Sequence, residues 1–396
     1  MCGHHFDGGR CHGRITGKVV GHLHIIAGVA PTNHRSDIQG LRAILITQVM
    51  LFHAWFVGSP IGVDAFIMIS AYLLTGSLMR RAERGELPSV WERWARTFQR
   101  LLPALTVTVV ATLLGSLAVL SPARWLGVIK QSYASLTYWQ NWLLAAISTD
   151  YYARDHADSS PLQHLWSMSM QGQMFLAWPL LIVGLVALAR WRGWSMRAVV
   201  FSGFALVTAA SLTWLVATPH DASVYFDTRA RIWEFALGSA IAVLAPKLQL
   251  PEAWARVVSA AALVVLVVFS LVLIGTYPGP MAAAPLLATS ALLLFSNEHD
   301  RFSVGRLLAW RPLAAMGDNS YAIYLVHWPI FVFYLVVTGR EQLGIADGLA
   351  LMVVSMGIAY LLTRYVDQPL RTLPWANSTG RRAQIIGLCL AVGLAF

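Results

Sequence analysis

The chain has 396 residues, of which 57% are hydrophobic and only 12% are charged. Its mean hydropathy of +0.59 is too high for a soluble domain, which must cover its core with polar surface. The composition therefore excludes an ordinary soluble protein and indicates a polytopic membrane protein embedded in a lipid bilayer. A net charge of +10 fits basic cytoplasmic loops better than nucleic-acid binding, and the 3 cysteines imply no disulfide framework.

Residues 1–35 are rich in Gly and His and too polar to be a signal peptide. They include the metal-ligating side chains Cys2, His4, His5, Cys11 and His12. The spacing of these side chains fits no standard zinc pattern, so we predict no metal site. We expect instead a disordered tail or a start codon assigned too early.

Ten apolar segments follow, each read as a helix crossing a hydrocarbon core of about 30 Å. They cover residues 41–57, 61–79, 101–120, 165–189, 198–217, 232–244, 257–274, 281–295, 313–337 and 345–365. We therefore predict an all-α polytopic integral membrane protein of about ten transmembrane helices, with residues 36–372 as its transmembrane domain. Residues 373–396 are predicted to be a cytoplasmic linker and a truncated eleventh helix, because the final apolar run 385–396 is too short to span.

Lys and Arg fall in alternate connections of the chain. The segment from Arg80 to Arg100 and the turn with Arg190, Arg192 and Arg197 are strongly basic, whereas residues 58–60 carry no basic side chain. Because basic loops stay on the cytoplasmic side, this pattern predicts a multi-pass protein of the cell membrane with a cytoplasmic N-terminus.

One connection expected on the outer side, residues 121–164, is unusually long. Its run 138–142 and the pair Tyr151 and Tyr152 mix aromatic and amide groups. This mixture is typical of a re-entrant or interfacial element lining an outward cavity, and equally of a simple aromatic belt.

Three ionisable residues occur in the first two apolar segments. Arg42 and His53 are eleven residues apart, which is three helical turns with about 20° left over, so both side chains face one side about 16 Å apart. Ionisable groups at membrane depth are functional candidates when they face the bundle interior. Asp64, at the start of the second helix, is expected to orient His53, to bind a substrate such as a sugar, or simply to interact favourably with the helix dipole.

Polar residues also occur in two later segments. Ser320, Tyr324 and His327 lie at positions i, i+4 and i+7, a single stripe that either lines a cavity or joins helices by hydrogen bonds. Glu234 follows Arg229 and Arg231, so it is expected either to line the same cavity or to pair with one of these arginines.

Five stretches taken together resemble the membrane-bound acyltransferase family 3, which includes the bacterial O-antigen and peptidoglycan O-acetyltransferases. They are Arg42 and His53 followed by GVDAFIMISAYLLT (62–75), SPLQHLWSMSMQGQMFLAWPLL (160–181), RARIWEFALGSAIA (229–242), GDNSYAIYLVHWPIF (317–331) and YVDQPLR (365–371). The chain departs from the family at Gln171 and Gly172, where a pair of Glu is usual, at Ala71, where Gly is usual, and at Asp367, where Glu is usual.

The resemblance implies transfer of an acyl group, usually acetyl, from cytoplasmic acyl-CoA to a hydroxyl of an extracytoplasmic glycan or lipid-linked sugar. No cofactor would be bound permanently. The expected catalytic residues are His53, as general base or acyl relay, and Asp64. Arg42, Arg96 and Arg100 would hold the CoA phosphates, although loop arginines are also explained by orientation alone. The acceptor cavity would contain Ser320, Tyr324, His327 and Glu234.

Three other possibilities follow from the same residues. A transporter of a sugar or ion would also have many helices and buried ionisable groups, but we find no inverted repeat. A purely structural scaffold gives no reason for the shared face of Arg42 and His53. If the chain is a fragment of a longer fusion, an extracytoplasmic esterase-like domain or protein would complete delivery to the acceptor.

Overall fold

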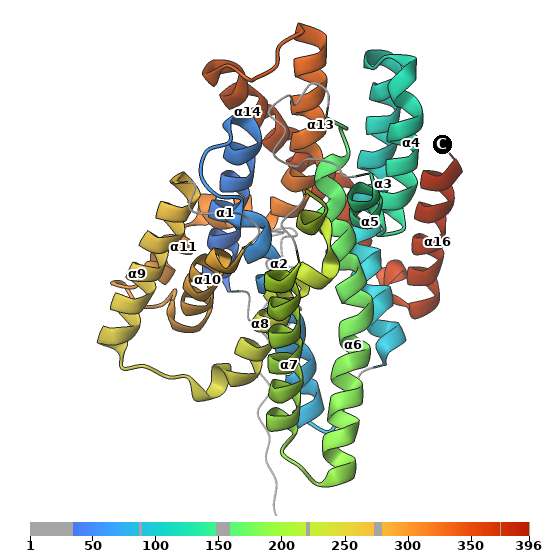
Figure 1. The fold of residues 1–396 in the computed structure, drawn as a ribbon. Coiled ribbons are helices and arrows are strands. Elements are labelled where there is room, and N and C mark those ends of the chain that lie inside the picture. Colours follow the sequence, from blue (N-terminus) through green and yellow to red (C-terminus); the bar gives the residue numbers. More distant parts are fainter. Residues whose placement is uncertain are drawn as a thin grey trace, which may run out of the picture. The chain divides into compact units, whose positions relative to one another are not determined.

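The computed structural model describes residues 35–86, 89–147, 159–218, 222–272, 279–372 and 374–395. Across these ranges the secondary structure is helical, without a β-strand (Figure 1). Tyr151, Tyr152 and all of the predicted tail except Arg35 lie outside the described residues.

The longer helices of the first half are α1 (Ser36–Trp55), α2 (Ile61–Glu83), α3 (Val90–Val119), α4 (Pro122–Leu136), α5 (Gln140–Ala146), α6 (Trp166–Arg192) and α7 (Met196–Ala217). Those of the second half are α8 (Thr228–Leu244), α9 (Glu252–Leu271), α10 (Ala283–Phe295), α11 (Val304–Leu308), α12 (Arg311–Asp318), α13 (Ser320–Thr338), α14 (Ile345–Leu362), α15 (Gln368–Thr372) and α16 (Thr379–Ala395). A π-helical turn, Thr363–Asp367, joins α14 to α15.

Each of the ten predicted segments is helical. In the described part of the chain, seven helical stretches are long and apolar enough to cross a membrane, and the stretch Pro280–Phe295 is a shorter apolar helix. The other two predicted segments fall in α1 and α8. Helix α1 carries Asp37, Arg42 and His53 among its 20 residues, and α8 has only 17 residues. The all-helical membrane fold expected from composition is confirmed.

The start of α3 differs from the prediction. The apolar run suggested a helix from residue 101, but α3 begins at Val90, where the Ser89 side chain accepts a hydrogen bond from the Glu92 backbone N–H. Capping at this serine extends the helix by more than two polar turns beyond its apolar part. The basic residues expected in a loop, including Arg96 and Arg100, therefore lie on a helix.

Two other predicted segments also have different boundaries. The expected helix 313–337 is divided at Asn319 into α12 and α13.

The long connection 121–164 contains α4 and α5, and the amide groups of α5 are buried. Gln140 donates to the Leu162 carbonyl at 2.7 Å, and Asn141 donates to the Phe226 carbonyl at 3.0 Å. These amides anchor α5 to the rest of the protein.

Helix α1 packs unusually closely on its neighbours α11 and α12. A Cβ atom at Gly40 would lie 1.8 Å from the Leu308 carbonyl oxygen, and one at Gly317 would lie 1.8 Å from the Gln39 carbonyl oxygen. Backbone contacts this close require glycine, because any side chain would clash. Both glycines therefore determine how near the helix carrying Arg42 and His53 lies to the chain segment before α13.

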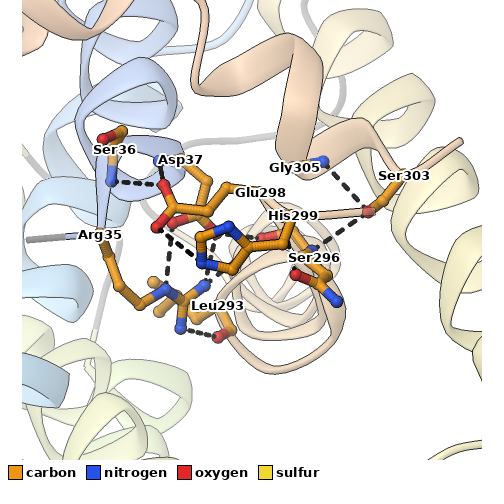
Figure 2. Close-up of polar contacts among 10 residues, drawn as sticks. Arg35, Ser36, Asp37, Leu293, Ser296, Glu298, His299, Ser303 and Gly305 are labelled. Atoms are coloured by element: carbon orange, nitrogen blue, oxygen red, sulfur yellow. Dashed lines mark hydrogen bonds and ion pairs between the residues drawn. The ribbon is translucent and has the colours of Figure 1, made fainter. Parts of the chain in front are cut away.

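A polar cluster holds the N-terminal end of α1 (Figure 2). Arg35 donates to both carboxylate oxygens of Asp37, at 3.0 and 2.5 Å, and Ser296 donates to Asp37 at 2.6 Å. A Glu298 oxygen accepts the backbone N–H of Ser36 at 2.8 Å, so a residue after α10 caps α1. Backbone N–H groups of a first helical turn lack intrahelical partners, and this contact supplies one.

The last helix, α16, packs against α3 and α4. Arg382 donates to the Gln99 side chain at 2.9 Å, and the Tyr133 hydroxyl donates to the Leu394 carbonyl at 2.9 Å. The helix begins at Thr379, so the apolar run 385–396 is only its later part. The segment predicted as the start of an eleventh helix is therefore packed on the same body as the other helices.

Candidate active site

A cavity of about 320 Å³ is bounded by α1, α2, α3, α6 and α13. Its lining residues are Arg42, Val63, Phe66, Ile67, Ile69, Ser70, Leu73, Leu74, Arg93, Arg96, Thr97, Arg100, Leu101, Ser167, Met168, Gln171, Phe175, Ser320, Tyr321 and Tyr324. Four arginines are among these lining residues of the described chain, and no acidic side chain is. The cavity is therefore strongly cationic on one side and apolar along α2.

The arginines come from two helices. Arg93, Arg96 and Arg100 lie at i, i+3 and i+7 of α3, so they share one face. Arg42 reaches the cavity from α1, with its guanidinium 3.0 Å from the Gln39 side-chain oxygen and 5.9 Å from the Phe66 ring centroid.

The neighbouring acid neutralises this charge only in part. Arg96 forms an ion pair of 2.5 Å with Glu92, in which both side chains are 39% exposed. Such an exposed pair contributes little and exchanges readily. A cavity lined by cations at a partly apolar wall attracts anionic ligands, and guanidinium groups bind phosphate oxygens in pairs.

His53, further along α1, is buried and pairs with His327 of α13. The Nδ1 atom of His53 lies 2.8 Å from Nε2 of His327, and Nδ1 of His327 lies 2.9 Å from the Ile323 carbonyl oxygen. A carbonyl only accepts, so His327 carries its proton on Nδ1 and, when neutral, accepts from His53 through Nε2. His53 then carries its proton on Nδ1, and in the neutral ring the lone pair is on Nε2.

A second, small pocket of about 10 Å³ lies beside this histidine pair, and it is lined by Phe52, His53, Phe56, Ser159, Gln163, His164 and Trp328. A third histidine, His164, has its Nε2 atom 3.2 Å from the Leu325 carbonyl oxygen. Because a carbonyl only accepts, this nitrogen carries the proton and donates it. The Nδ1 atom of His164 has no hydrogen-bond partner among the described residues. The pocket has room for about one water molecule.

Tyr324 lies between the cavity and the small pocket. Its side chain lines the cavity, its hydroxyl donates to the main-chain oxygen of His164, and its oxygen lies 2.8 Å from the Ser167 hydroxyl. His164 in turn lines the small pocket. The contact between Tyr324 and His164 therefore joins the wall of the cavity to the wall of the pocket that contains His53.

A buried ionic cluster joins α2 to α8. Arg231 forms an ion pair with Asp64 and another, of 3.0 Å, with Glu234, and all three side chains are at most 1% exposed. The Trp166 and Tyr225 rings lie about the guanidinium, with centroids 5.5 and 5.4 Å from its carbon. Removing one member of such a cluster leaves an uncompensated buried charge, so the cluster acts first on the fold.

The structure brings five of the predicted site residues to one cavity: Arg42, Arg96, Arg100, Ser320 and Tyr324. The last two were expected in a separate acceptor cavity, but the stripe on α13 faces the same space as the arginines.

The other predicted residues lie elsewhere. His327 pairs with His53, and Glu234 pairs with Arg231, which was the expected alternative to cavity lining. Asp64 meets Arg231, a partner that the sequence did not indicate.

Four residues of the site region were missed. Arg93 was counted only as a loop cation, although its helical spacing to Arg96 and Arg100 could have singled it out. His164 and Ser167 lie in the quoted stretch 160–181, where polar groups bordering an apolar helix were the available signal. Arg231 was considered only as a partner of Glu234.

Fold and site together define a multi-pass membrane protein with a cationic cavity that ends near a buried histidine pair. Residues 35–364 match the family described as Acyltransferase domain, Acyl_transf_3. The chain therefore belongs to this acyltransferase family, which confirms the resemblance carried by the five sequence stretches.

Three relatives illustrate the similarity. Peptidoglycan O-acetyltransferase OatA of Listeria monocytogenes is 28% identical over 354 residues, covering 86% of this chain and 56% of the relative. O-acetyltransferase OatA of Staphylococcus aureus is 25% identical over 351 residues, covering 84% and 57%. BcsY of Komagataeibacter xylinus, described as a membrane-bound transacylase, is 33% identical over 371 residues, covering 91% and 90%.

The relatives differ in length. The chain spans a little over half the length of the two OatA proteins, at 56% and 57%, but nearly all of BcsY, at 90%. The similarity therefore covers only part of each OatA protein. No solved structure matches the chain significantly.

Proposed function

We propose that the chain transfers an acyl group, most simply acetyl, from acyl-CoA to a hydroxyl of a cell-envelope glycan or glycolipid. One observation carries this proposal: the cavity lined by four arginines extends to Tyr324, one helical turn before the His327 that pairs with His53. The family and the printed names of the relatives, peptidoglycan O-acetyltransferase and transacylase, support this reaction class.

The donor would enter the cavity with its phosphates toward Arg42 and the arginines of α3. Coenzyme A carries several phosphate charges, which charge-assisted hydrogen bonds from guanidinium groups balance. The apolar wall from α2 would accommodate the pantetheine arm, and the thioester would lie toward Ser320 and Tyr324.

The transfer itself needs a base. Nε2 of neutral His53 would take the proton of the acceptor hydroxyl, whose oxygen then attacks the thioester carbon. A new C–O bond forms, the C–S bond breaks, and the proton passes to the leaving thiolate. His327 would hold the His53 ring by accepting from Nδ1–H, a contact that strengthens while His53 is positively charged.

The orientation follows from the distribution of basic residues. Turns rich in Arg stay on the cytoplasmic side, so the basic end of α3 would face the cytoplasm, where acyl-CoA is available. The acceptor would then approach from the opposite side, close to His53.

Transfer of labelled acetyl from acetyl-CoA, measured in membranes, tests this function. We expect the variant His53→Ala to lose about 10² to 10⁴ of the rate, the usual contribution of general acid–base catalysis, while still inserting and folding. The matched control is His299→Ala, because the His299 side chain is 89% exposed and lines neither the cavity nor the pocket.

Two outcomes would contradict the proposal. Full transfer by the His53→Ala protein would remove His53 from the chemistry. Uptake of a sugar or ion into proteoliposomes without acyl-CoA, combined with no acetyl transfer, would favour the transporter. Mass spectrometry of envelope glycans from cells with and without the gene would then identify the acceptor.

A further inference from the structure

Three polar residues of α13 lie along one line from the cavity to the histidine pair. Ser320 and Tyr324 line the cavity, and His327 contacts His53. At about 1.5 Å per residue, Tyr324 lies about 6 Å beyond Ser320 and His327 about 4.5 Å further along the axis. A group that moves from the arginines to His53 therefore passes both hydroxyls.

Ser320 has an unused hydrogen-bonding group. Its side chain is 1% exposed, it faces the cavity, and its hydroxyl has no hydrogen-bond partner among the described residues. Many buried hydroxyls on helices of this protein bond to the carbonyl four residues earlier, as Thr108 does at 2.9 Å on α3 and Ser355 at 2.7 Å on α14. Buried polar groups are almost always paired, so an unpaired one in a cavity wall indicates a ligand that accepts from it.

Tyr324 has a hydroxyl whose bonding can be exchanged. It has one proton, which it donates to the His164 main-chain oxygen, so the Ser167 hydroxyl must donate to the Tyr324 oxygen. Rotation of the phenol away from His164 would break the contact that joins the wall of the cavity to the wall of the pocket of His53. The same rotation would direct the O–H group into the cavity.

We propose that Ser320 and Tyr324 bind the carbonyl oxygen of the acyl thioester and that Tyr324 is the gate between the donor cavity and His53. This inference rests on the proposed function for its donor. The Tyr324 O–H exchanges the His164 carbonyl for the thioester carbonyl, so arrival of the donor opens the path to the histidine pair.

The two hydroxyls then serve the reaction as an oxyanion site. When the acceptor oxygen attacks, the carbonyl π electrons move to the carbonyl oxygen, which becomes negative between the two donors. Collapse of this intermediate reforms the C=O bond and breaks the C–S bond, and the thiolate leaves with the proton held by His53. Tyr324 returns to His164 once coenzyme A has left the cavity.

Binding of two coenzyme A analogues in detergent tests the proposal without turnover. Acetonyl-CoA, in which a methylene group lies between sulfur and the carbonyl, retains the acceptor oxygen, whereas S-propyl-CoA lacks it. We expect the full chain to bind the ketone about tenfold more tightly, as one or two hydrogen bonds would give. The variants Ser320→Ala and Tyr324→Phe should lower this ratio toward one, and the control Ser355→Ala should keep it.

The Ser320→Ala variant is the sharper of the two. The Ser320 hydroxyl that this variant removes bonds to no described residue, so a structural role cannot explain a lost preference for the ketone. In acetyl transfer, Tyr324→Phe should lower kcat about 10²-fold, the effect of a lost oxyanion donor, and should also raise the KM for acetyl-CoA by up to about tenfold, because the bound thioester loses a hydrogen bond.

The outcomes separate this proposal from the proposed function. Equal affinity of the wild type for both analogues, or an unchanged ratio in Ser320→Ala, overturns the carbonyl site even if acetyl transfer is intact. Failure of both analogues and of coenzyme A itself to bind overturns the donor cavity and, with it, the gate. The proposal is supported if the wild type binds the ketone more tightly than the thioether and the variants Ser320→Ala and Tyr324→Phe do not.

Discussion

The first turn of α1 and the part of the helix beyond it are built from ionisable residues in opposite ways. At the N-terminal end, Asp37 is 1% exposed and accepts from Arg35 and Ser296, while Glu298 caps the helix (Figure 2). Further along, Arg42 faces a cavity without acidic lining residues in the described chain, and His53 contacts a second histidine, His327. Opposite charges are paired in the first turn, whereas Arg42 beyond it faces no carboxylate in the cavity lining of the described chain.

This difference separates residues that hold the helix from residues that act on a ligand. A buried carboxylate with complementary donors has its charge satisfied by the protein itself. The cavity lining of the described chain contains four arginines and no carboxylate, and Arg96 is paired with Glu92 outside this lining, so much of the positive charge is available for an anion. Substitutions in the first turn should change stability, and those at Arg42 and His53 should change substrate binding or rate.

The largest change in stability is expected for Asp37→Ala. Arg35 and Ser296 would lose their acceptor, and removal of one member of a buried, hydrogen-bonded pair costs up to about 3 kcal/mol when the partner is half-exposed. The apparent unfolding midpoint in detergent should fall clearly, and activity should fall with it. The control Asp347→Ala removes an exposed ion pair with Arg340 and should have little effect. Equal midpoints for the two variants would contradict the comparison.

Arg42→Ala should change substrate binding and leave stability nearly unchanged. Loss of a charge-assisted contact to a phosphate should raise the KM for acyl-CoA about 10- to 100-fold, because such a bond contributes about 1.5 to 3 kcal/mol. The unfolding midpoint should change little. Arg301→Ala is the matched control, since Arg301 is exposed and does not line the cavity. A lower midpoint with an unchanged KM would assign Arg42 to the fold.

Glu298→Ala should have a smaller effect on stability. The backbone N–H of Ser36 would lose its acceptor, and loss of a cap costs about 1 kcal/mol. Both kinetic constants should remain near wild type at temperatures below unfolding. Glu298→Gln, which keeps an acceptor oxygen, should recover most of the loss, and failure to do so would argue against capping.

The smallest effect concerns pH and the loop after α10. Arg256 donates to Asp300 at 2.6 Å and, with the Phe302 backbone N–H, holds the pKa of the Asp300 carboxyl below its usual value. An aspartate in an unfolded chain titrates at about pH 3.9. The stabilisation that Asp300 gives the folded protein is therefore complete above that pH and disappears as the pH falls through the lower pKa of the folded state. The wild type should therefore lose slightly more stability on acidification than Asp300→Asn. An identical pH profile for the two proteins would contradict this expectation.

The sequence predicted the helices well because each one is a long apolar run. It placed their ends less well, as at α3, where apolarity stops near residue 101 but the cap at Ser89 extends the helix. Hydropathy records burial in lipid, whereas capping and helix propensity decide the polar extension. The misplaced boundary mattered because Arg93, Arg96 and Arg100 reach the cavity only from one face of a helix.

Within the site, sequence spacing related residues of the same helix only. It put Arg42 and His53 on one face of α1, and Ser320, Tyr324 and His327 on one stripe of α13. It could not relate the two helices to each other, so His327 was assigned to an acceptor cavity although it pairs with His53. Likewise, Asp64 and Arg231 are 167 positions apart, and their contact follows only from the packing of α2 on α8.

The sequence by itself determined the membrane class, the helical segments, the family and most of the residues that we propose for the chemistry. These are local properties, set by apolar length, charge and spacing along one chain segment. The tertiary structure alone decided which charges are paired and which are left for a ligand. That distinction depends on contacts between distant helices, such as the approach of α1 to α11 at Gly40 and to α12 at Gly317, and no local pattern encodes it.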